Sequence, residues 1–372
     1  MPEPSGVETL FTPFDVKSLR LKNRFVMAPM SRYFATGGVP NQEMAAYYAR
    51  RAAGGVGLIV TEGTYVGDPA AGPNARVPHF YGAESLSGWQ RVVEAVHAEG
   101  VPIIPQLWHT GAYRGNAPEF NPAHESVSPS GIGLTGEPVG RALSASSVER
   151  IFDYFAESAV HAQRLGFDGL EIHGAHGYLP DQFMWSNTNR RDDIWAESSA
   201  FSARLVARVR SAVGSEFPIF YRFSQWKLEN YDARLVSTPD ELRALLSPLV
   251  EAGVDVFHAS TRRYWLPEFP EEVIGEGRDR NLSGWVREVT GVPTVTVGSV
   301  GLDHSFYEDG NDNQRAAPAS LAPLIERFDR GEFDLVAVGR ALLSDPEWVN
   351  KIRDGRVEDL IDYRVSHRST LS

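Results

Sequence analysis

The chain has 372 residues, 42% of them hydrophobic and 23% charged, which is the balance of an ordinary water-soluble globular protein. Its net charge of -12 argues against nucleic acid as a partner, because binding to phosphates needs a basic face. There is no cysteine, which excludes disulfides, cysteine-ligated zinc, iron–sulfur clusters and thiol nucleophiles.

The N-terminal segment MPEPSGVETLF lacks the basic start and apolar core of a secretory signal peptide. No apolar run approaches the length of roughly 20 residues that crosses a bilayer. We therefore expect a cytoplasmic protein that acts on a small molecule and has no membrane partner. The composition leaves open whether the chain forms a homo-oligomer.

Short apolar strands alternate with amphipathic helices along most of the chain. Ahead of them, residues 11–21 alternate apolar and polar side chains around Lys17 and Ser18, which predicts a hairpin. Ser146 and Glu149 form a capping box for one helix, and Thr238 with Pro239 marks the start of another. The strands are predicted over residues 25–28, 56–61, 101–107, 167–173, 218–223, 254–258, 292–297 and 333–338.

Eight such units predict an α/β protein with a closed (β/α)8 barrel, since alternating β and α elements form a parallel sheet. A doubly wound sheet is disfavoured, because residues 27–31 (MAPMS) replace the glycine-rich turn that it needs. Residues 112–141 are rich in Pro, Gly and Ser and lack periodicity, which predicts a lid or insertion after strand three. No disordered linker divides the chain, so we expect one domain over residues 1–372.

The most informative run is GLEIHGAHGY, residues 169–178. It predicts a strand that brings two imidazoles, His173 and His176, together with the phenol of Tyr178. Two neutral imidazoles can donate hydrogen bonds to one substrate oxygen while a tyrosine delivers a proton. Paired histidines can also bind a metal or satisfy buried backbone groups, so the run alone leaves these readings open.

In a barrel of this kind, catalytic residues come from the C-terminal ends of the strands. The predicted strand ends are polar and aromatic and contain almost no carboxylates, which disfavours a metal hydrolase. Gly298 and Gly339, followed by Arg340, end the last two strands. Glycine backbone beside a guanidinium suits a bound phosphate.

The chain resembles the old yellow enzyme family of flavin-dependent ene-reductases at several places, in the family's order and over nearly its whole length. The matching motifs are LKNRFVMAPM (21–30), RAAGGVGLIVTEG (51–63), QLWHTG (106–111), the histidine run extended to Phe183, and Val338-Gly339-Arg340 with Asp345-Pro346.

This resemblance implies non-covalent FMN as cofactor, with NADH or NADPH as the hydride donor. The flavin ring, its pyrimidine edge and its phosphate would each have their own set of residues. These are Pro29, Met30, Ser31 and Gly63 beside the ring, Gln106 on the pyrimidine edge, Arg222 near N1 and C2=O, and Gly298, Ser299, Gly339 and Arg340 at the phosphate.

The resemblance also implies reduction of activated alkenes. His173 and His176 would bind the electron-withdrawing oxygen of an enone, flavin N5 would give hydride to the β-carbon, and Tyr178 would protonate the α-carbon. The pocket wall would be shaped by Trp108, Tyr264 and Trp265.

Three segments depart from the family pattern. Residues 189–197 lack the family's Tyr-Gly-Gly-Ser turn and should follow a different path, residues 261–269 are unusual, and residues 303–315 form a polar insertion. These departures bear on which substrate the protein uses, and they leave the expected fold unchanged.

Two other functions stay open. An oxidative N-demethylase or amine dehydrogenase would use the same FMN site, and Tyr264, Trp265 and Glu268 would cage a quaternary ammonium, although that branch often carries an iron–sulfur cluster on cysteines. A metal-dependent hydrolase would use His109, His173, His176 and His258.

Overall fold

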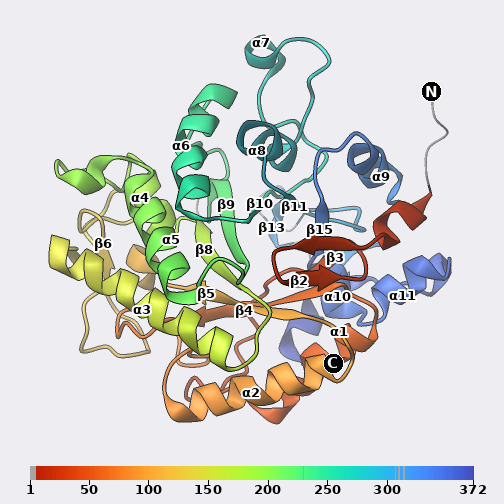
Figure 1. Ribbon diagram of the computed structural model, residues 1–372, viewed down its shortest axis with the longest axis horizontal. Coiled ribbons are helices and arrows are strands. Elements are labelled where there is room, and N and C mark those ends of the chain that lie inside the picture. Colours follow the sequence, from red (N-terminus) through yellow and green to blue (C-terminus); the bar gives the residue numbers. More distant parts are fainter. Residues whose placement is uncertain (1–5, 229, 306, 309–310, 313–314) are drawn as a thin grey trace.

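The computed structural model describes residues 6–228, 230–305, 307–308, 311–312 and 315–372. Eight parallel strands form a closed barrel whose order around the sheet follows the chain, and β15 pairs with β3 to close it (Figure 1). The predicted (β/α)8 barrel is confirmed. Its strands are β3 (Phe25–Met27), β4 (Leu58–Tyr65), β5 (Ile103–Trp108), β8 (Leu170–His176), β9 (Ile219–Lys227), β10 (Val256–Ser260), β11 (Thr294–Val297) and β15 (Leu335–Val338).

Helices surround the barrel, and the longer ones turn an apolar face toward the strands (Figure 1). The α-helices are α1 (Gln42–Ala53), α2 (Ala83–His97), α3 (Ala145–Arg164), α4 (Leu179–Met184), α5 (Ala200–Val213), α6 (Pro239–Ala252), α7 (Glu271–Ile274), α8 (Leu282–Thr290), α9 (Ala322–Asp329), α10 (Arg340–Ser344) and α11 (Trp348–Arg353). Short 3-10 helices are η1 (Val7–Phe11), η2 (Gly111–Arg114), η3 (Ile194–Ala196), η4 (Val357–Asp359) and η5 (Val365–Ser369).

Side-chain caps mark the starts of α3 and α6, among others. Thr238 Oγ1 accepts the backbone N–H of Glu241, whose side chain accepts in return, so the predicted start of α6 is confirmed. The capping box predicted at Ser146 and Glu149 is wrong. Ser144 caps α3 instead, because its Oγ accepts the N–H of Ser147 at 3.2 Å and the helix starts earlier.

The predicted N-terminal hairpin closes the floor of the barrel. It consists of β1 (Phe14–Val16) and β2 (Leu19–Leu21), which pair antiparallel. Ser18, at its tip, donates its N–H to the carbonyl of Glu216, just ahead of β9, so the hairpin lies at the N-terminal ends of the strands. Its apolar side chains pack on a cluster inside the barrel that includes Leu58 and Ile104.

The insertion at residues 112–141 is held by one buried arginine. Arg114 donates to the carbonyls of Gly72, Phe120, Asn121 and His124 at 2.6–3.2 Å. The insertion includes β6 (Val127–Ser128), which pairs with β7 (Arg141–Ala142) directly after it.

Two of the three segments that depart from the family pattern, residues 189–197 and 303–315, contact other loops of the chain. Within residues 189–197, Arg191 donates to the carbonyls of Pro129 and Leu143 at 2.9 and 2.5 Å, which ties this loop to the insertion. The insertion at residues 303–315 lies partly outside the described residues. Its described parts include β12 (Tyr307–Glu308) paired with β13 (Asn311–Asp312), and the start of β14 (Arg315–Ala316), which pairs with β16 (Tyr363–Arg364).

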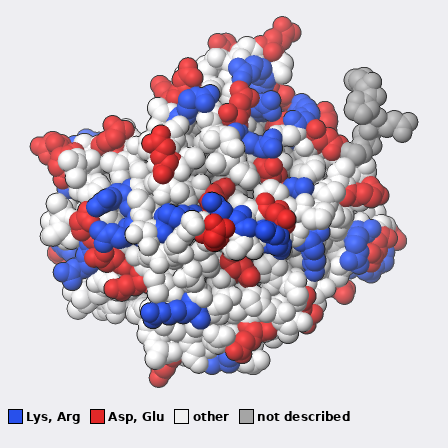
Figure 2. Space-filling view, in the orientation of Figure 1, with Lys and Arg blue, Asp and Glu red and all other residues white. Residues whose placement is uncertain are grey.

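Acidic and basic side chains are interspersed over the face shown in Figure 2. No helix among the described residues is both long and apolar enough to cross a membrane.

A buried ion pair supports the turn that follows β8. Lys227 Nζ, at the end of β9, lies 2.8 Å from Asp181 Oδ1 in α4, and both side chains are fully buried. Asp181 Oδ2 accepts the N–H of Gly177 at 2.5 Å, and Lys227 also donates to the carbonyl of Gln225 at 2.9 Å. The pair therefore ties the Gly177 turn, together with the residues on either side of it, to β9.

Replacing Lys227 with Met should lower the free energy of unfolding by about 3–5 kcal/mol, because it leaves the buried Asp181 carboxylate without a countercharge. Denaturant unfolding measures this loss. Adding Asp181→Asn removes that charge and keeps an acceptor for Gly177, so the double variant should recover most of the stability. A double variant as unstable as Lys227→Met would contradict this role of the pair.

Candidate active site

A cavity of about 670 Å³ lies at the C-terminal ends of the strands, and all eight strand ends contribute to its lining. Its position follows from the parallel barrel, in which these ends meet at one rim. The structure brings together there every residue predicted to hold the cofactor: Pro29, Met30, Ser31, Gly63, Gln106, Arg222, Gly298, Ser299, Gly339 and Arg340. Trp108, His173, His176 and Tyr178 line the same cavity.

The two imidazoles and the phenol converge on one wall of this cavity. The ring of His173 lies with its centroid 5.1 Å from that of His176 and 4.8 Å from that of Tyr178. The side chains converge because the pairing of β8 with β9 has a register shift between Gly174 and His176. His176 has a φ of +66°, a left-handed conformation, and its N–H is bound by Ser224 Oγ at 2.9 Å.

The electrostatics of this wall keep all three groups uncharged. Burial, and next the positive charge of Arg222, lower the pKa values of His173 and His176 well below the usual 6.5. Burial, and next the neighbouring Tyr113, raise the pKa of Tyr178 well above 10. At neutral pH the cavity therefore presents two neutral imidazoles, each with one N–H, and a phenol that keeps its proton.

A buried carboxylate, that of Glu171, lies on β8 two residues before His173. Glu171 accepts from Gln106 Nε2 at 2.7 Å, and its second oxygen lies 2.7 Å from His258 Nδ1. Burial alone would raise the pKa of Glu171, but His258 and Arg222 outweigh it and lower that pKa. The ionised Glu171 thus orients the amide of Gln106 and balances the charge of Arg222.

The ends of the last two strands leave backbone exposed to the cavity. A Cβ on Gly298, whose φ is +135°, would lie 2.7 Å from the carbonyl oxygen of Thr261, so only glycine fits there. A Cβ on Gly339 would meet nothing closer than 3.6 Å, so this glycine opens space beside the guanidinium of Arg340. Arg340 is oriented by Ser299 Oγ, to which it donates at 3.0 Å.

The residues present fit FMN. Gly339 and Arg340 combine open backbone with a cation, as a phosphate site requires. Among the described residues, the buried Nε of Arg222 has no hydrogen-bond partner, which leaves a donor for an acceptor atom of a ligand. The amide of Gln106 is fixed at the cavity wall by Glu171.

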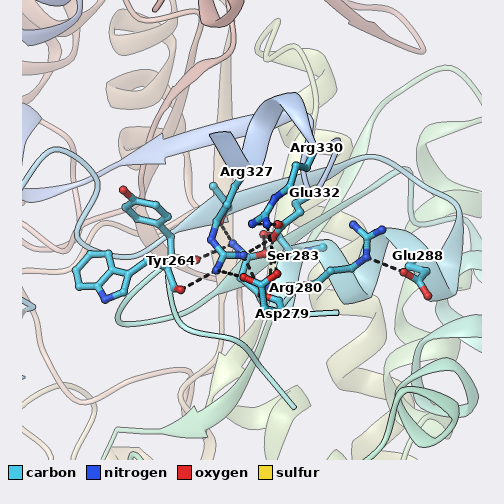
Figure 3. A network of polar contacts seen from close by, with 12 residues as sticks. Tyr264, Asp279, Arg280, Ser283, Glu288, Arg327, Arg330 and Glu332 are labelled. Carbon is cyan, nitrogen blue, oxygen red and sulfur yellow. Dashed lines mark hydrogen bonds and ion pairs between the residues drawn. The ribbon is translucent and has the colours of Figure 1, made fainter. Parts of the chain in front are cut away.

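Tyr264 and Trp265 do not line the cavity, and the expectation that they shape its wall is wrong. Tyr264 is 4% exposed and lies beside the network of Arg327 and Glu332 (Figure 3). Its carbonyl accepts from Asn281 Nδ2, and that of Trp265 accepts from Arg327 Nη2, both at 2.8 Å. These bonds hold Tyr264 and Trp265 away from the cavity, whereas Thr261 and Arg262 of the same loop line it.

The wall is formed instead by Trp226 near the end of β9, Tyr231 after it and Arg262 after β10, and the sequence analysis missed them. Trp226 stacks on His176 with centroids 4.2 Å apart, and Arg262 Cζ lies 4.6 Å from the Trp226 ring and 3.9 Å from that of Tyr231. The rule that strand ends carry the site would have found Trp226 if the strand had been extended from residue 223 to Lys227, where β9 ends.

The histidines of the hydrolase alternative do not form a common site. His258 is bound to Glu171, and His109 Nδ1 accepts the N–H of Gly111 at 3.0 Å. Over the part of the chain that the structure describes, no three His, Asp or Glu side chains are grouped to hold a metal ion.

Comparison with known proteins assigns the chain to a family. A model of the NADH:flavin oxidoreductase / NADH oxidase family matches residues 9–359. An NADH oxidase of Thermoanaerobacter brockii is 33% identical over 361 residues, which cover 94% of this chain and 52% of that protein, so the chain spans about half of its length. The 12-oxophytodienoate reductase 7 of Oryza sativa subsp. japonica is 30% identical over 373 residues, covering 92% of this chain and 87% of the relative.

A solved structure of morphinone reductase in complex with tetrahydroNAD has the same fold. It matches with a TM-score of 0.76 and 26% identity, over 96% of this chain and 93% of that chain. The chain therefore belongs to the NADH:flavin oxidoreductase / NADH oxidase family, the old yellow enzyme family that its motifs resemble.

Proposed function

We propose that this protein reduces the C=C bond of activated alkenes such as enones, using NADH or NADPH. The observation that carries the proposal is the convergence of His173, His176 and Tyr178, all uncharged, on one wall of a cavity that fits FMN. FMN, held by the residues named above, supplies the chemistry of hydride transfer from the nicotinamide to the alkene.

His173 and His176 bind the electron-withdrawing oxygen of the substrate. Each neutral imidazole donates one hydrogen bond, and in a buried site such bonds stabilise the negative charge that develops on this oxygen. The withdrawal of electron density leaves the β-carbon of the alkene electrophilic.

Tyr178 supplies the proton to the α-carbon. Its raised pKa keeps the hydroxyl protonated at neutral pH, and its ring is held edge-on by Trp108 and Tyr113, with centroids 4.9 and 5.5 Å away. A buried, immobilised phenol can act as a general acid toward a carbon that has become basic.

An anaerobic absorbance titration tests the proposed function. The purified protein should show a flavin spectrum that bleaches with NADH or NADPH and returns when 2-cyclohexen-1-one is added. A colourless protein, or a flavin that the enone does not reoxidise, would contradict the proposal. A flavin that is bleached by an N-methylated amine but not by nicotinamide would favour the demethylase alternative.

Tyr178→Phe should slow reoxidation by the enone by about 10²–10⁴-fold, the usual contribution of a general acid. Reduction by NAD(P)H needs no proton from this residue and should stay close to the wild-type rate. Stopped-flow absorbance separates the two half-reactions, and Tyr154→Phe on α3, outside the cavity, is the matched control. Equal losses in both half-reactions would rule out the proton-donor role.

His173→Ala should weaken the binding of phenolates, which imitate the substrate oxygen, by roughly 10- to 100-fold, the value of a hydrogen bond to a charged group. Absorbance titration of the oxidised protein with a para-substituted phenol gives the dissociation constant. His161→Ala, on α3, is the control. Unchanged affinity in His173→Ala would remove this residue from the oxygen site.

The rate of reoxidation by an uncharged enone should be flat between about pH 6 and 9. The pKa values of His173 and His176 are lowered, so both imidazoles are already neutral at the lower limit, and the raised pKa of Tyr178 keeps its proton at the upper limit. Stopped-flow measurements across this range provide the check. A rate that rises or falls through pH 7 would mean that one of the three groups titrates there.

A further inference from the structure

A serine at the end of β10 contacts the second imidazole of the oxygen site. Ser260 Oγ lies 2.8 Å from His176 Nε2, and Arg222 Nη2 donates to the same oxygen at 3.3 Å. Ser260 is 2% exposed and borders the cavity. Among the described residues, these two nitrogens are the only hydrogen-bond partners of its hydroxyl.

The protons of this contact can be assigned from the chemistry of its members. A guanidinium only donates, so Arg222 occupies a lone pair of Ser260 Oγ. A neutral imidazole has one N–H and one bare nitrogen. Either Ser260 donates to a bare Nε2, and His176 carries its proton on Nδ1, or a protonated Nε2 donates to Ser260, and Nδ1 is bare.

Burial decides between these two arrangements. In the second, Ser260 accepts from both neighbours, and its hydroxyl hydrogen, inside a buried site, has no acceptor among the described residues. Such an unsatisfied buried donor is unfavourable, because it has lost its hydrogen bonds to water and gained none in return. In the first arrangement every proton has a partner, and the cation at Arg222 polarises the hydroxyl into a stronger donor.

We propose that Ser260 is a positioning residue that holds His176 in the tautomer with its proton on Nδ1, the one nitrogen that the protein leaves for the substrate oxygen. The proposal rests on the proposed function, in which His176 donates to that oxygen. With the opposite tautomer, Nδ1 would present a lone pair to the oxygen and repel it.

The geometry around the ring supports this role. Trp226 stacks on the imidazole, and its Nε1 donates to the carbonyl of Ser260 at 3.1 Å, so the stacking ring and the serine are fixed to one another. His173 differs, because its buried Nδ1 has no hydrogen-bond partner among the described residues. Ser260 thus determines which ring nitrogen of His176 carries the proton and donates a hydrogen bond.

The first test is ¹⁵N NMR of the flavin-loaded protein labelled on histidine, which distinguishes protonated from bare ring nitrogens. The His176 signals are assigned by their absence from His176→Asn. The wild type should carry the proton on Nδ1, and Ser260→Ala should shift it toward Nε2, whereas Ser260→Thr keeps the hydroxyl and the Nδ1 proton. A wild-type proton on Nε2, or a tautomer that Ser260→Ala leaves unchanged, would overturn the proposal.

The second test separates the tautomer from a general structural effect. Ser260→Ala should slow reoxidation by 2-cyclohexen-1-one by roughly 100-fold, the lower end of the range for loss of one donor to an oxyanion, and leave reduction by NAD(P)H nearly unchanged. Ser202→Ala, which removes a buried hydroxyl bound to Tyr221 outside the cavity, is the matched control.

A double-mutant cycle is completed by making Ser260→Ala in the His176→Asn variant. An amide has a fixed donor and no tautomers, so removal of Ser260 should have little further effect there. An equal loss in both backgrounds would overturn the proposal. If the wild-type flavin is not reoxidised by the enone at all, the proposed function fails, and the NMR result still decides whether Ser260 sets the tautomer.

Discussion

Hydrogen bonding between β15 and β3 closes the parallel sheet, and the position of every functional group depends on that closure. An open sheet would spread eight strand ends along an edge, whereas the barrel brings them to one rim. Inside the barrel, the lower layers are filled by Leu58, Ile104, Phe220 and other apolar side chains of one cluster. The polar residues therefore gather only in the layer above them, where little water competes for their hydrogen bonds.

Within that layer, burial disfavours the charged form of every titratable group, and neighbouring charges decide which group stays ionised. It removes charge from His173, His176 and Tyr178, yet Glu171 stays ionised because His258 and Arg222 lie beside it. The site therefore places two neutral imidazoles and a protonated phenol near the charged Arg222, which pairs with His173 in the register of β8 with β9. Neutral donors beside a fixed cation suit a reaction in which negative charge appears only during the reaction itself.

The periodicity of the sequence was enough to predict the barrel, because each strand and helix is dictated by local patterns. The positions proposed for the cofactor also follow from the sequence, because the family resemblance and the predicted strand ends point to the same part of the barrel. The paths of the loops were harder to predict from the sequence. Tyr264 and Trp265 follow the end of β10, but Arg327, 62 residues beyond Trp265, holds them away from the cavity through a carbonyl contact that no local pattern encodes. Trp226 was missed because β9 continues beyond its apolar stretch, paired with β8 across an irregular register.

The residue that caps a helix is also hard to predict from the sequence alone. Ser144, Ser146 and Ser147 lie within four positions, and all can serve as helix caps, so composition alone does not select Ser144. Which serine becomes the cap depends on the position of the chain that precedes α3, and this preceding chain includes the β6–β7 pair.

The hairpin at the barrel floor has a kinetic consequence. Because β1, β2 and the apolar cluster fill the barrel from below, the cavity has no passage through the floor, and its ligands enter from the rim. In the proposed function, a nicotinamide and an alkene would therefore enter by the same rim. If they also occupy the same site in turn, the reaction follows ping-pong kinetics, and each substrate at high concentration inhibits by occupying the site that the other requires.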